Sequence, residues 1–464
     1  MPQDLVPVLL SRATELLEKQ FAALPAFESA ADPAEMKQIL EDVARRMGDN
    51  FPFFHPLYAG QMLKPPHPVA RAAYALAMTI NPNNHARDGG RASSEMEIEA
   101  VQGIAGIFGW TVFLGHLTSS GTLANLEALW VAGQLAQGKR GNRIVGSEQA
   151  HYTHRRISAV LKLEYASIAA DCRGRMNLDA LETELRRGDV GTVVVTLGTT
   201  AIGAVDPLAE ILALRSRYNF RVHVDAAYGG YFRLISLAAP AQRAFAVIDQ
   251  ADSIVIDPHK HGLQPYGCGC VLFRDPAVGR FYKHDSPYTY FTSKQLHLGE
   301  ISLECSRAGA SAVALWATQQ LLPLVPGGEF ARGLARGRSA ALDLDWRLRE
   351  DRTGRLQPLA AGAPELDIVV WKMNAKTPEL SSELTQRVFD ACAARDLHLA
   401  LVQLPLSWFE SAAEINPQNC TTNGVGLVTC LRSVLMKPEH EAWMDRIWER
   451  FTASCDEVMG EYRS

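Results

Sequence analysis

Lys260 is the residue of this sequence best placed for covalent chemistry. It ends the run Asp257-Pro258-His259-Lys260, which follows the apolar stretch Ser253-Ile254-Val255-Ile256. That stretch is predicted to be a buried strand, so the lysine should lie just past a strand's carboxyl end, where ligands bind in parallel sheets. Such a lysine could form a Schiff base with a carbonyl if burial and nearby positive charge lower its pKa. Taken alone, a lysine after a strand is more often a solvated loop residue.

A carboxylate follows a second predicted strand. Arg221-Val222-His223-Val224 brings Asp225 to the same edge about one crossover before the lysine. A carboxylate there can pair with a protonated pyridine nitrogen, the partner that pyridoxal phosphate needs to act as an electron sink. The small Ala227 would let a flat ring lie against the backbone. By itself, Asp225 would also fit a helix N-cap after a strand.

Together these segments resemble a known family. His223-Val224-Asp225-Ala226-Ala227-Tyr228 followed by Asp257-Pro258-His259-Lys260 is similar to the pyridoxal-phosphate-dependent group II amino-acid decarboxylases, which include aromatic-amino-acid, tyrosine and glutamate decarboxylases. The likeness runs from about His55 to the C-terminal region. It implies an α/β, aspartate-aminotransferase-like fold with a mainly parallel-sheet large domain and a small C-terminal α/β domain. It also implies pyridoxal 5'-phosphate as the cofactor.

Asp257 departs from the Asn found in many aromatic-amino-acid and glutamate enzymes, and looks more like microbial tyrosine decarboxylases. A second anion near the cofactor phosphate then has to be offset or turned away.

A phosphate-binding segment is predicted further upstream. Leu117–Asn125 places small and hydroxylated residues before a helical run, so hydroxyls and free backbone N–H groups meet at a helix N-terminus, an arrangement that binds phosphate. The resemblance assigns the cofactor phosphate to Ser120, Gly121 and Thr122. Without the resemblance, the cluster would fit an ordinary N-cap.

Further site residues come from the resemblance. It places a histidine that stacks on the cofactor ring at His151, a threonine near the cofactor and the substrate carboxylate at Thr199, and a phosphate contact at His259. Either histidine would otherwise be assigned a structural role. His154 lies nearby and is left out of the predicted site.

The segment from Tyr282 to Glu304 loses periodicity and is polar and aromatic, which is typical of an active-site lid. In the resembling family a loop tyrosine returns a proton after carbon dioxide leaves, and enzymes with phenylalanine there tend towards oxidative aldehyde formation. Tyr288, which follows Pro287, is the first choice for that acid and Tyr290 the second. Aromatic packing without chemistry is the alternative.

Three parts are predicted along the chain: residues 1–94 as an N-terminal helical, dimerisation segment, 95–325 as the cofactor-binding large domain, and 326–464 as the small C-terminal domain. Apolar positions at helical spacing in residues 1–20 indicate an amphipathic helix that packs on a partner. By resemblance this region embraces a second subunit, giving a homodimer with the active site at the subunit interface.

Four other segments have alternative predictions. The resemblance implies that His55–Tyr58 and Asn81–His85 line the substrate entrance. The alternative is that both segments are plain loops. The Ser306–Gly309 segment, with Arg307, looks like the one that reaches the partner subunit's phosphate. Arg432, at a strand end, is either an active-site residue or part of a surface salt bridge.

Composition narrows the class of protein. The chain has 464 residues, 47% of them hydrophobic, and a net charge of −5. Its apolar stretches fall short of the ~20 residues of a membrane-spanning helix, and no signal peptide or basic stripe is seen, so we expect a cytoplasmic protein that binds neither membrane nor nucleic acid. The eight scattered cysteines fit reduced thiols. Cys268-Gly269-Cys270 lacks zinc-knuckle spacing, so no metal site is predicted.

The predicted activity is therefore decarboxylation of an L-amino acid, with an aromatic, tyrosine-like substrate favoured, to the amine and carbon dioxide. A pyridoxal-phosphate-dependent oxidative aldehyde synthase, a carbon–carbon lyase, or a decarboxylase of acidic or aliphatic amino acids would use the same cofactor residues. A non-catalytic protein or a nucleotide-binding enzyme is less favoured. The cofactor residues are all present, and no lysine follows the glycine of Ser119–Thr122.

Overall fold

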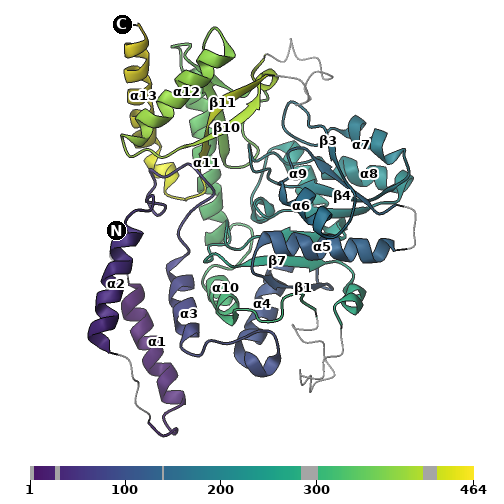
Figure 1. Ribbon diagram of the computed structural model, residues 1–464, viewed down its shortest axis with the longest axis vertical. Coiled ribbons are helices and arrows are strands. Elements are labelled where there is room, and N and C mark those ends of the chain that lie inside the picture. The colour runs from purple at the N-terminus through teal and green to yellow at the C-terminus, as the bar shows by residue number, and fades with distance from the viewer. Residues whose placement is uncertain (1–4, 27–31, 138–140, 284–300, 411–425, 464) are drawn as a thin grey trace.

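The computed structural model describes residues 5–26, 32–137, 141–283, 301–410 and 426–463. It contains two sheets, and the long helix α11 (Glu329–Glu350) runs between the parts of the molecule that hold them (Figure 1). The α/β class expected from the sequence is confirmed. The other helices of the described residues are α1 (Val6–Gln20), α2 (Pro33–Met47), α3 (Pro68–Met78), α4 (Arg91–Ile107), α5 (Gly121–Ala136), α6 (Thr153–Val160), α7 (Leu178–Leu185), α8 (Leu208–Tyr218), α9 (Ala239–Ala246), α10 (Gly309–Leu321), α12 (Pro378–Ala393) and α13 (His440–Arg463).

The larger sheet has seven strands in the order β1-β7-β6-β5-β4-β2-β3. Its middle is parallel, and β7 runs antiparallel to both of its neighbours. The sequence therefore predicted a mainly parallel sheet correctly. The strands are β1 (Leu114–Thr118), β2 (Arg143–Ser147), β3 (Tyr165–Ile168), β4 (Val190–Thr196), β5 (Arg221–Asp225), β6 (Ser253–Ile256) and β7 (Gly269–Phe273).

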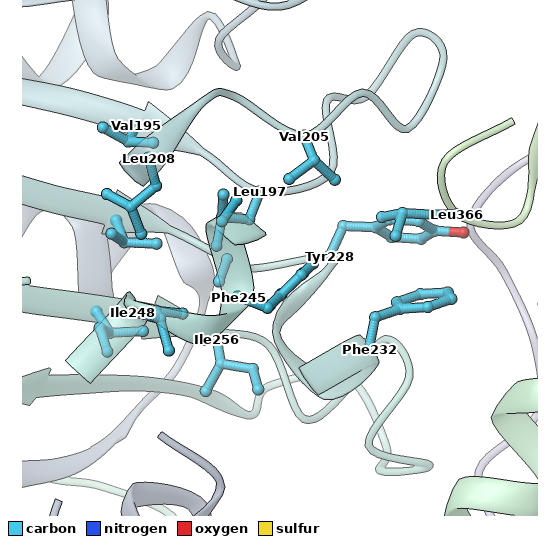
Figure 2. Packing of buried hydrophobic residues seen from close by; sticks show 14 of the residues in the cluster. Val195, Leu197, Val205, Leu208, Tyr228, Phe232, Phe245, Ile248, Ile256 and Leu366 are labelled. Carbon is cyan, nitrogen blue, oxygen red and sulfur yellow. The ribbon is translucent and has the colours of Figure 1, made fainter. Parts of the chain in front are cut away.

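Helices cover both faces of this sheet, which is why its strands are apolar at consecutive positions. Val193 and Val195 pack in one buried cluster with α8 and α9, whereas Val194 between them packs in another with α5 and α6. Figure 2 shows the first cluster near the strand ends, where Val195 and Ile256 lie with Leu208, Phe245 and Ile248. The strands are therefore packed between two layers of helices.

The topology brings the candidate segments to one edge. Because β7 is antiparallel to both β1 and β6, those two strands point the same way, and their carboxyl ends share an edge with those of β4 and β5. The loops that leave this edge are the ones that carry the candidate cofactor residues.

The smaller sheet is antiparallel, in the order β10-β11-β9-β8. Its strands are β8 (Leu356–Pro358), β9 (Ile368–Met373), β10 (Ala400–Pro405) and β11 (Leu427–Val434). A buried cluster that includes Trp371, Val388 and Phe451 packs this sheet against α11, α12 and α13.

At the N-terminus α1 packs beside α3 (Figure 1). None of the residues of α2 is buried. The division at residues 94 and 325 stays a prediction. Within the described ranges, no helix combines the length and apolar character needed to cross a membrane.

Candidate active site

Lys260 lies in a tight turn directly after β6. Its backbone N–H donates to the carbonyl of Asp257 over 2.9 Å, and its Nζ lies 3.1 Å from Asp257 Oδ2. His259 Nε2 is 3.5 Å from the same oxygen, and His259 Nδ1 is 2.6 Å from the carbonyl oxygen of Cys268, which anchors the turn to the start of β7. The negative charge of Asp257, the complication noted in the sequence, is thus faced by the ammonium group of Lys260.

The N-terminus of α5 forms a cradle beside this turn. Ser120 is the N-cap, and its hydroxyl accepts a hydrogen bond from Leu123 N over 3.2 Å. A Cβ atom at Gly121 would lie 2.5 Å from both carboxylate oxygens of Asp257, so only glycine fits here. The free N–H groups of the first turn make this helix end suited to a phosphate.

Asp225 ends β5 and is held by several donors. Its Oδ2 lies 2.7 Å from His154 Nε2, and its Oδ1 accepts from Ala227 N over 3.1 Å. Asn125 Nδ2 is 3.5 Å from Oδ2 and its amide oxygen is 2.8 Å from His223 Nε2. Burial alone raises the pKa of Asp225, but the bond from His154, the charges of His154 and Lys260, and the Ala227 amide hold it well below the usual range. Asp225 is therefore a carboxylate at neutral pH.

His154 is the residue that the sequence analysis missed. It is fully buried in α6, three residues after His151, and it contacts Asp225 directly. The spacing was the available signal, because residues three apart at a helix start share a side of the helix. His151 also lies at the site, where burial lowers its pKa, and its Nδ1 accepts from Thr153 N over 3.3 Å.

These groups line a cavity of about 210 Å³. The cavity brings together eight of the predicted cofactor residues: Ser120, Gly121, Thr122, His151, Asp225, Ala227, His259 and Lys260. Tyr288 and Tyr290, the candidate acids, lie outside the described residues.

Thr199 is not among the lining residues. Its side chain is fully buried and its hydroxyl accepts from Ala204 N over 3.0 Å, while Thr196, Gly198 and Thr200 face the cavity instead. The turn begins at Gly198, whose φ of +103° rotates the following side chains away from the alternation of a strand. The predicted contact of Thr199 with the cofactor therefore has no geometric support.

Arg432 is not in a surface salt bridge, so that alternative is wrong. It is 3% exposed, and its guanidinium donates to the carbonyls of Thr200 and Ala201 over 2.7 and 3.0 Å and to Gln61 Oε1 over 3.1 Å. Strand β11 of the smaller sheet thus holds, through Arg432, the turn after Gly198 that forms one wall of the cavity.

Arg307 is buried inside its own subunit. Its guanidinium lies 2.6 Å from Glu97 Oε1 and donates to the carbonyls of Leu117 and Asn84. Asn84 itself donates to Glu97 Oε2 over 2.6 Å. The Arg307 side chain therefore ties the segment before α10 to α4 and β1, and the reach of the Ser306–Gly309 segment to a partner's phosphate stays a prediction.

The donor set fits pyridoxal 5'-phosphate. A lysine amine, an ionised carboxylate, a histidine ring and a helix N-terminus are what its aldehyde, ring nitrogen, ring face and phosphate respectively require. Gly121 has no side chain, and Asp257 Oδ1 has no hydrogen-bond partner among the described residues. Both leave space for a polar group beside that helix end. Fold and cavity together define an enzyme that uses this cofactor.

Comparison with known proteins identifies the family. Residues 21–322 match the pyridoxal-dependent decarboxylase conserved domain, so the chain belongs to that family. It is 26% identical to the L-tyrosine decarboxylase of Enterococcus faecium, over 78% of this chain and 76% of that protein. It is 29% identical to the probable L-tyrosine/L-aspartate decarboxylase of Methanothermobacter thermautotrophicus, over 70% of this chain and 86% of that protein. The protein is a pyridoxal-phosphate-dependent amino-acid decarboxylase.

Solved structures of similar fold agree with the architecture. Mouse CSAD in its apo form superposes with a TM-score of 0.76 at 20% identity, over 95% of this chain and 91% of that one. Oryza sativa TDC with PLP and tryptamine gives 0.74 at 17% identity, over 98% and 95%. At these identities the likeness shows the fold, and the aspartate-aminotransferase-like fold expected from the sequence is confirmed.

Proposed function

We propose that this enzyme decarboxylates an aromatic, tyrosine-like L-amino acid to the amine and carbon dioxide. The observation that carries the substrate class is the charge of the cavity wall. Among the described lining residues, Lys260 is the only lysine or arginine. An acidic substrate would need a second cation for its side-chain carboxylate, whereas an aromatic side chain needs none.

Arg432 does not supply that cation. Its guanidinium already donates to protein oxygens at Gly60, Gln61, Thr200 and Ala201. Near Gln61, the hydroxyl of Tyr266 donates to Met62 O over 3.4 Å, and the Tyr266 ring lies 5.1 Å from that of His259, which lines the cavity. The L-tyrosine decarboxylase relatives from Enterococcus faecium and Levilactobacillus brevis agree with this choice, although the second alignment covers 63% of that protein.

Each site residue is proposed to have one task. When bound, pyridoxal 5'-phosphate supplies an electron sink for the bond that breaks. Lys260 attaches the cofactor through the carbonyl carbon of the cofactor. Asp225, which His154 keeps ionised, holds a proton on the ring nitrogen. His151 covers one face of the ring and excludes water from the substrate carboxylate, which favours dispersal of its charge.

The phosphate is proposed to lie against the first turn of α5. Ser120, Gly121 and Thr122 supply hydroxyl and N–H donors, and His259 is placed beside them. Once Lys260 carries the cofactor, His259 is the remaining group near Asp257 that can balance its charge, at 3.5 Å.

A proton must return to Cα after carbon dioxide leaves, and we propose Tyr288 as its donor. The Tyr288→Phe enzyme is expected to shift product from amine towards aldehyde, because a phenyl ring cannot donate the proton. Products are identified by mass after complete conversion. Tyr290→Phe is the matched control; if it alone causes the shift, Tyr290 is the acid.

The test of the substrate class is an end-point screen of purified enzyme with added cofactor. Tyrosine, phenylalanine and tryptophan are compared with aspartate, glutamate and 2,4-diaminobutyrate, recording carbon dioxide and organic product. Amine equal to carbon dioxide from an aromatic substrate supports the proposal. Turnover of aspartate alone would overturn the proposal. That outcome would match the name of one relative, the aspartate 1-decarboxylase of Aliivibrio fischeri, which is 32% identical over 42% of this chain. Aldehyde with ammonia would instead indicate an oxidative aldehyde synthase.

Lys260→Ala is the control for the screen. It is expected to abolish multiple turnover and to leave no cofactor attached after borohydride reduction, because Lys260 is the proposed point of attachment. Full turnover by this variant would contradict the assignment of the site.

We also propose that the enzyme is a homodimer that uses its N-terminal helices. Apolar side chains are exposed on α2, among them Ile39, Leu40 and Val43, and such a face is typical of a subunit contact. Light scattering on the size-fractionated full chain should give a dimer, and Ile39→Glu should weaken it. Val160→Glu, at an exposed position on α6, is the control.

A further inference from the structure

A second cavity, of about 300 Å³, lies where the N-terminal segment, the large domain and the small domain meet. We call it the junction cavity. Its wall comes from Phe54, residues 64–68, His261 and Leu263, Leu322, the first two turns of α11, and residues 436–439. Helices α3, α11 and α13 all begin at or beside this wall, and helix N-termini carry partial positive charge.

Two lysines, Lys64 and Lys437, lie in this wall. Lys437 is 3% exposed and donates to Tyr58 O over 2.5 Å, while Lys64 donates to Met436 O over 3.3 Å. Each ammonium has three N–H groups, so each keeps donors to spare. Within the described residues, neither has a carboxylate oxygen within 4.0 Å. Burial lowers the pKa of Lys64 to about 8 and that of Lys437 to about 7.

His261 adds an unsatisfied polar atom to the same wall. It is 2% exposed, and its Nε2 lies 3.3 Å from Asp367 Oδ2, but its Nδ1 has no hydrogen-bond partner among the described residues. Buried polar atoms are normally bonded to protein, water or a ligand. Lys437 is the buried one of the two lysines, and a buried cation without an anion is likewise unfavourable.

The carboxylates near the cavity do not satisfy these groups. Asp367 is engaged by His261 and by the hydroxyl of Tyr228, which donates over 2.5 Å. Glu329 pairs with Arg332 and Arg336, at 2.8 and 3.4 Å. Glu439 is exposed at the rim and contributes only a distant charge to the two lysines.

From the cavity, the uncompensated ammonium groups and the unbonded imidazole nitrogen, we infer that the junction cavity is a binding site for a small oxyanion of the phosphate class. An oxyanion offers several acceptors to the spare N–H groups of Lys64 and Lys437 and matches the charge of the three helix N-termini. It would also link the N-terminal segment to residues 436–439 of the small domain. Nothing in the proposed decarboxylation uses this site.

The experiment is a calorimetric titration of the cofactor-loaded enzyme with inorganic phosphate at neutral pH and constant ionic strength. Loaded enzyme is used so that the cofactor's own phosphate occupies the α5 cradle. We expect saturable binding of one phosphate per chain, weakened roughly tenfold or more by Lys437→Met or Lys64→Met because each removes a charged donor. Lys376→Met, at an exposed position, should bind as the natural enzyme does.

Two additional titrations test the proposal further. Lys437→Arg keeps the charge and should retain binding, which separates loss of the donor from general damage to the fold. Glycerol 3-phosphate in place of inorganic phosphate tells whether a phosphate ester or the free anion is preferred, and binding of either supports the site.

Proton uptake tests whether the two lysines take part in binding. Titrations in buffers of different ionisation enthalpy should show uptake on binding, because an anion raises the pKa of neighbouring lysines. The titratable groups of the wall, or close to the two lysines, include His55, His67, His261, Glu329, Asp367, Glu439 and His440. Absence of saturable binding, or binding that both methionine variants leave unchanged, would overturn the proposal.

Discussion

Replacing His154 by leucine should destabilise the apoprotein by about 3 kcal/mol at neutral pH. His154 is the main hydrogen-bond partner of a buried carboxylate, and leaving a buried charge without its partner typically costs about 3–5 kcal/mol. The lower end applies here. Asp225 keeps the Ala227 amide at 3.1 Å and the Asn125 amide at 3.5 Å, and it borders a cavity large enough for water. Urea unfolding of the apoprotein, followed by circular dichroism, measures the difference.

His154→Gln is the matched control, because its amide can donate to Asp225 and does not titrate. The carboxylate in the leucine variant keeps its burial but loses its main donor, so its pKa should rise above the ordinary ~3.9. A carboxyl group whose pKa is raised in the folded state destabilises the fold at pH values above its ordinary pKa. This destabilisation decreases as the pH falls and the group binds a proton. The stability gap between the leucine and glutamine variants should therefore shrink from pH 7.5 to pH 5.5.

Two results would refute this account of His154. One is a leucine variant within about 0.5 kcal/mol of the natural protein, the range of a neutral surface substitution. The other is a glutamine variant as unstable as the leucine variant, which would mean that imidazole packing, rather than the bond to Asp225, stabilises the site. In the loaded enzyme, the leucine variant should also release cofactor faster, as followed by cofactor fluorescence.

Two other predictions concern single positions. Gly121→Ala should weaken cofactor binding by roughly tenfold or more, since its Cβ would lie 2.5 Å from the Asp257 oxygens and overpacking typically costs about 1–3 kcal/mol; fluorescence titration measures it, and unchanged affinity would contradict the cradle. In anion-free buffer, the stability of the natural enzyme should rise from pH 7 to 8.5, because Lys437, with its pKa lowered to about 7, is deprotonated in the fold while the unfolded chain stays protonated. Urea midpoints should show a shallower rise in Lys437→Met, and equal slopes would refute it.

Much of the site followed from the sequence because its positions depend on local rules. Short apolar runs ending at Thr196, Asp225 and Ile256 are strands of one parallel sheet, so the residues after them had to meet at one edge. The phosphate segment required only a helix start after β1. These inferences needed the order of strands and no side-chain detail.

Positions beyond a strand end were harder to predict. The family resemblance gave Thr199, but after the left-handed turn at Gly198 it is Thr200 that lines the cavity. His154 was left out although it lies three residues after His151, because that spacing alone does not distinguish a buried histidine that contacts a carboxylate from one that fills a helix face. Both errors are displacements of a few residues within a correctly placed segment.

Contacts between distant segments could not be predicted at all. Arg432 acts on Thr200 and Ala201 from more than two hundred residues away, and Asp367 joins Tyr228 to His261 across the same boundary. Both come from the region of the smaller sheet and engage residues next to the cofactor cavity, so this region forms part of the wall behind the Gly198 turn. Loss of the Arg432 contacts should therefore alter the shape of the substrate side of the cavity while Lys260, Asp225 and the α5 cradle stay in place, since those lie on the large sheet itself.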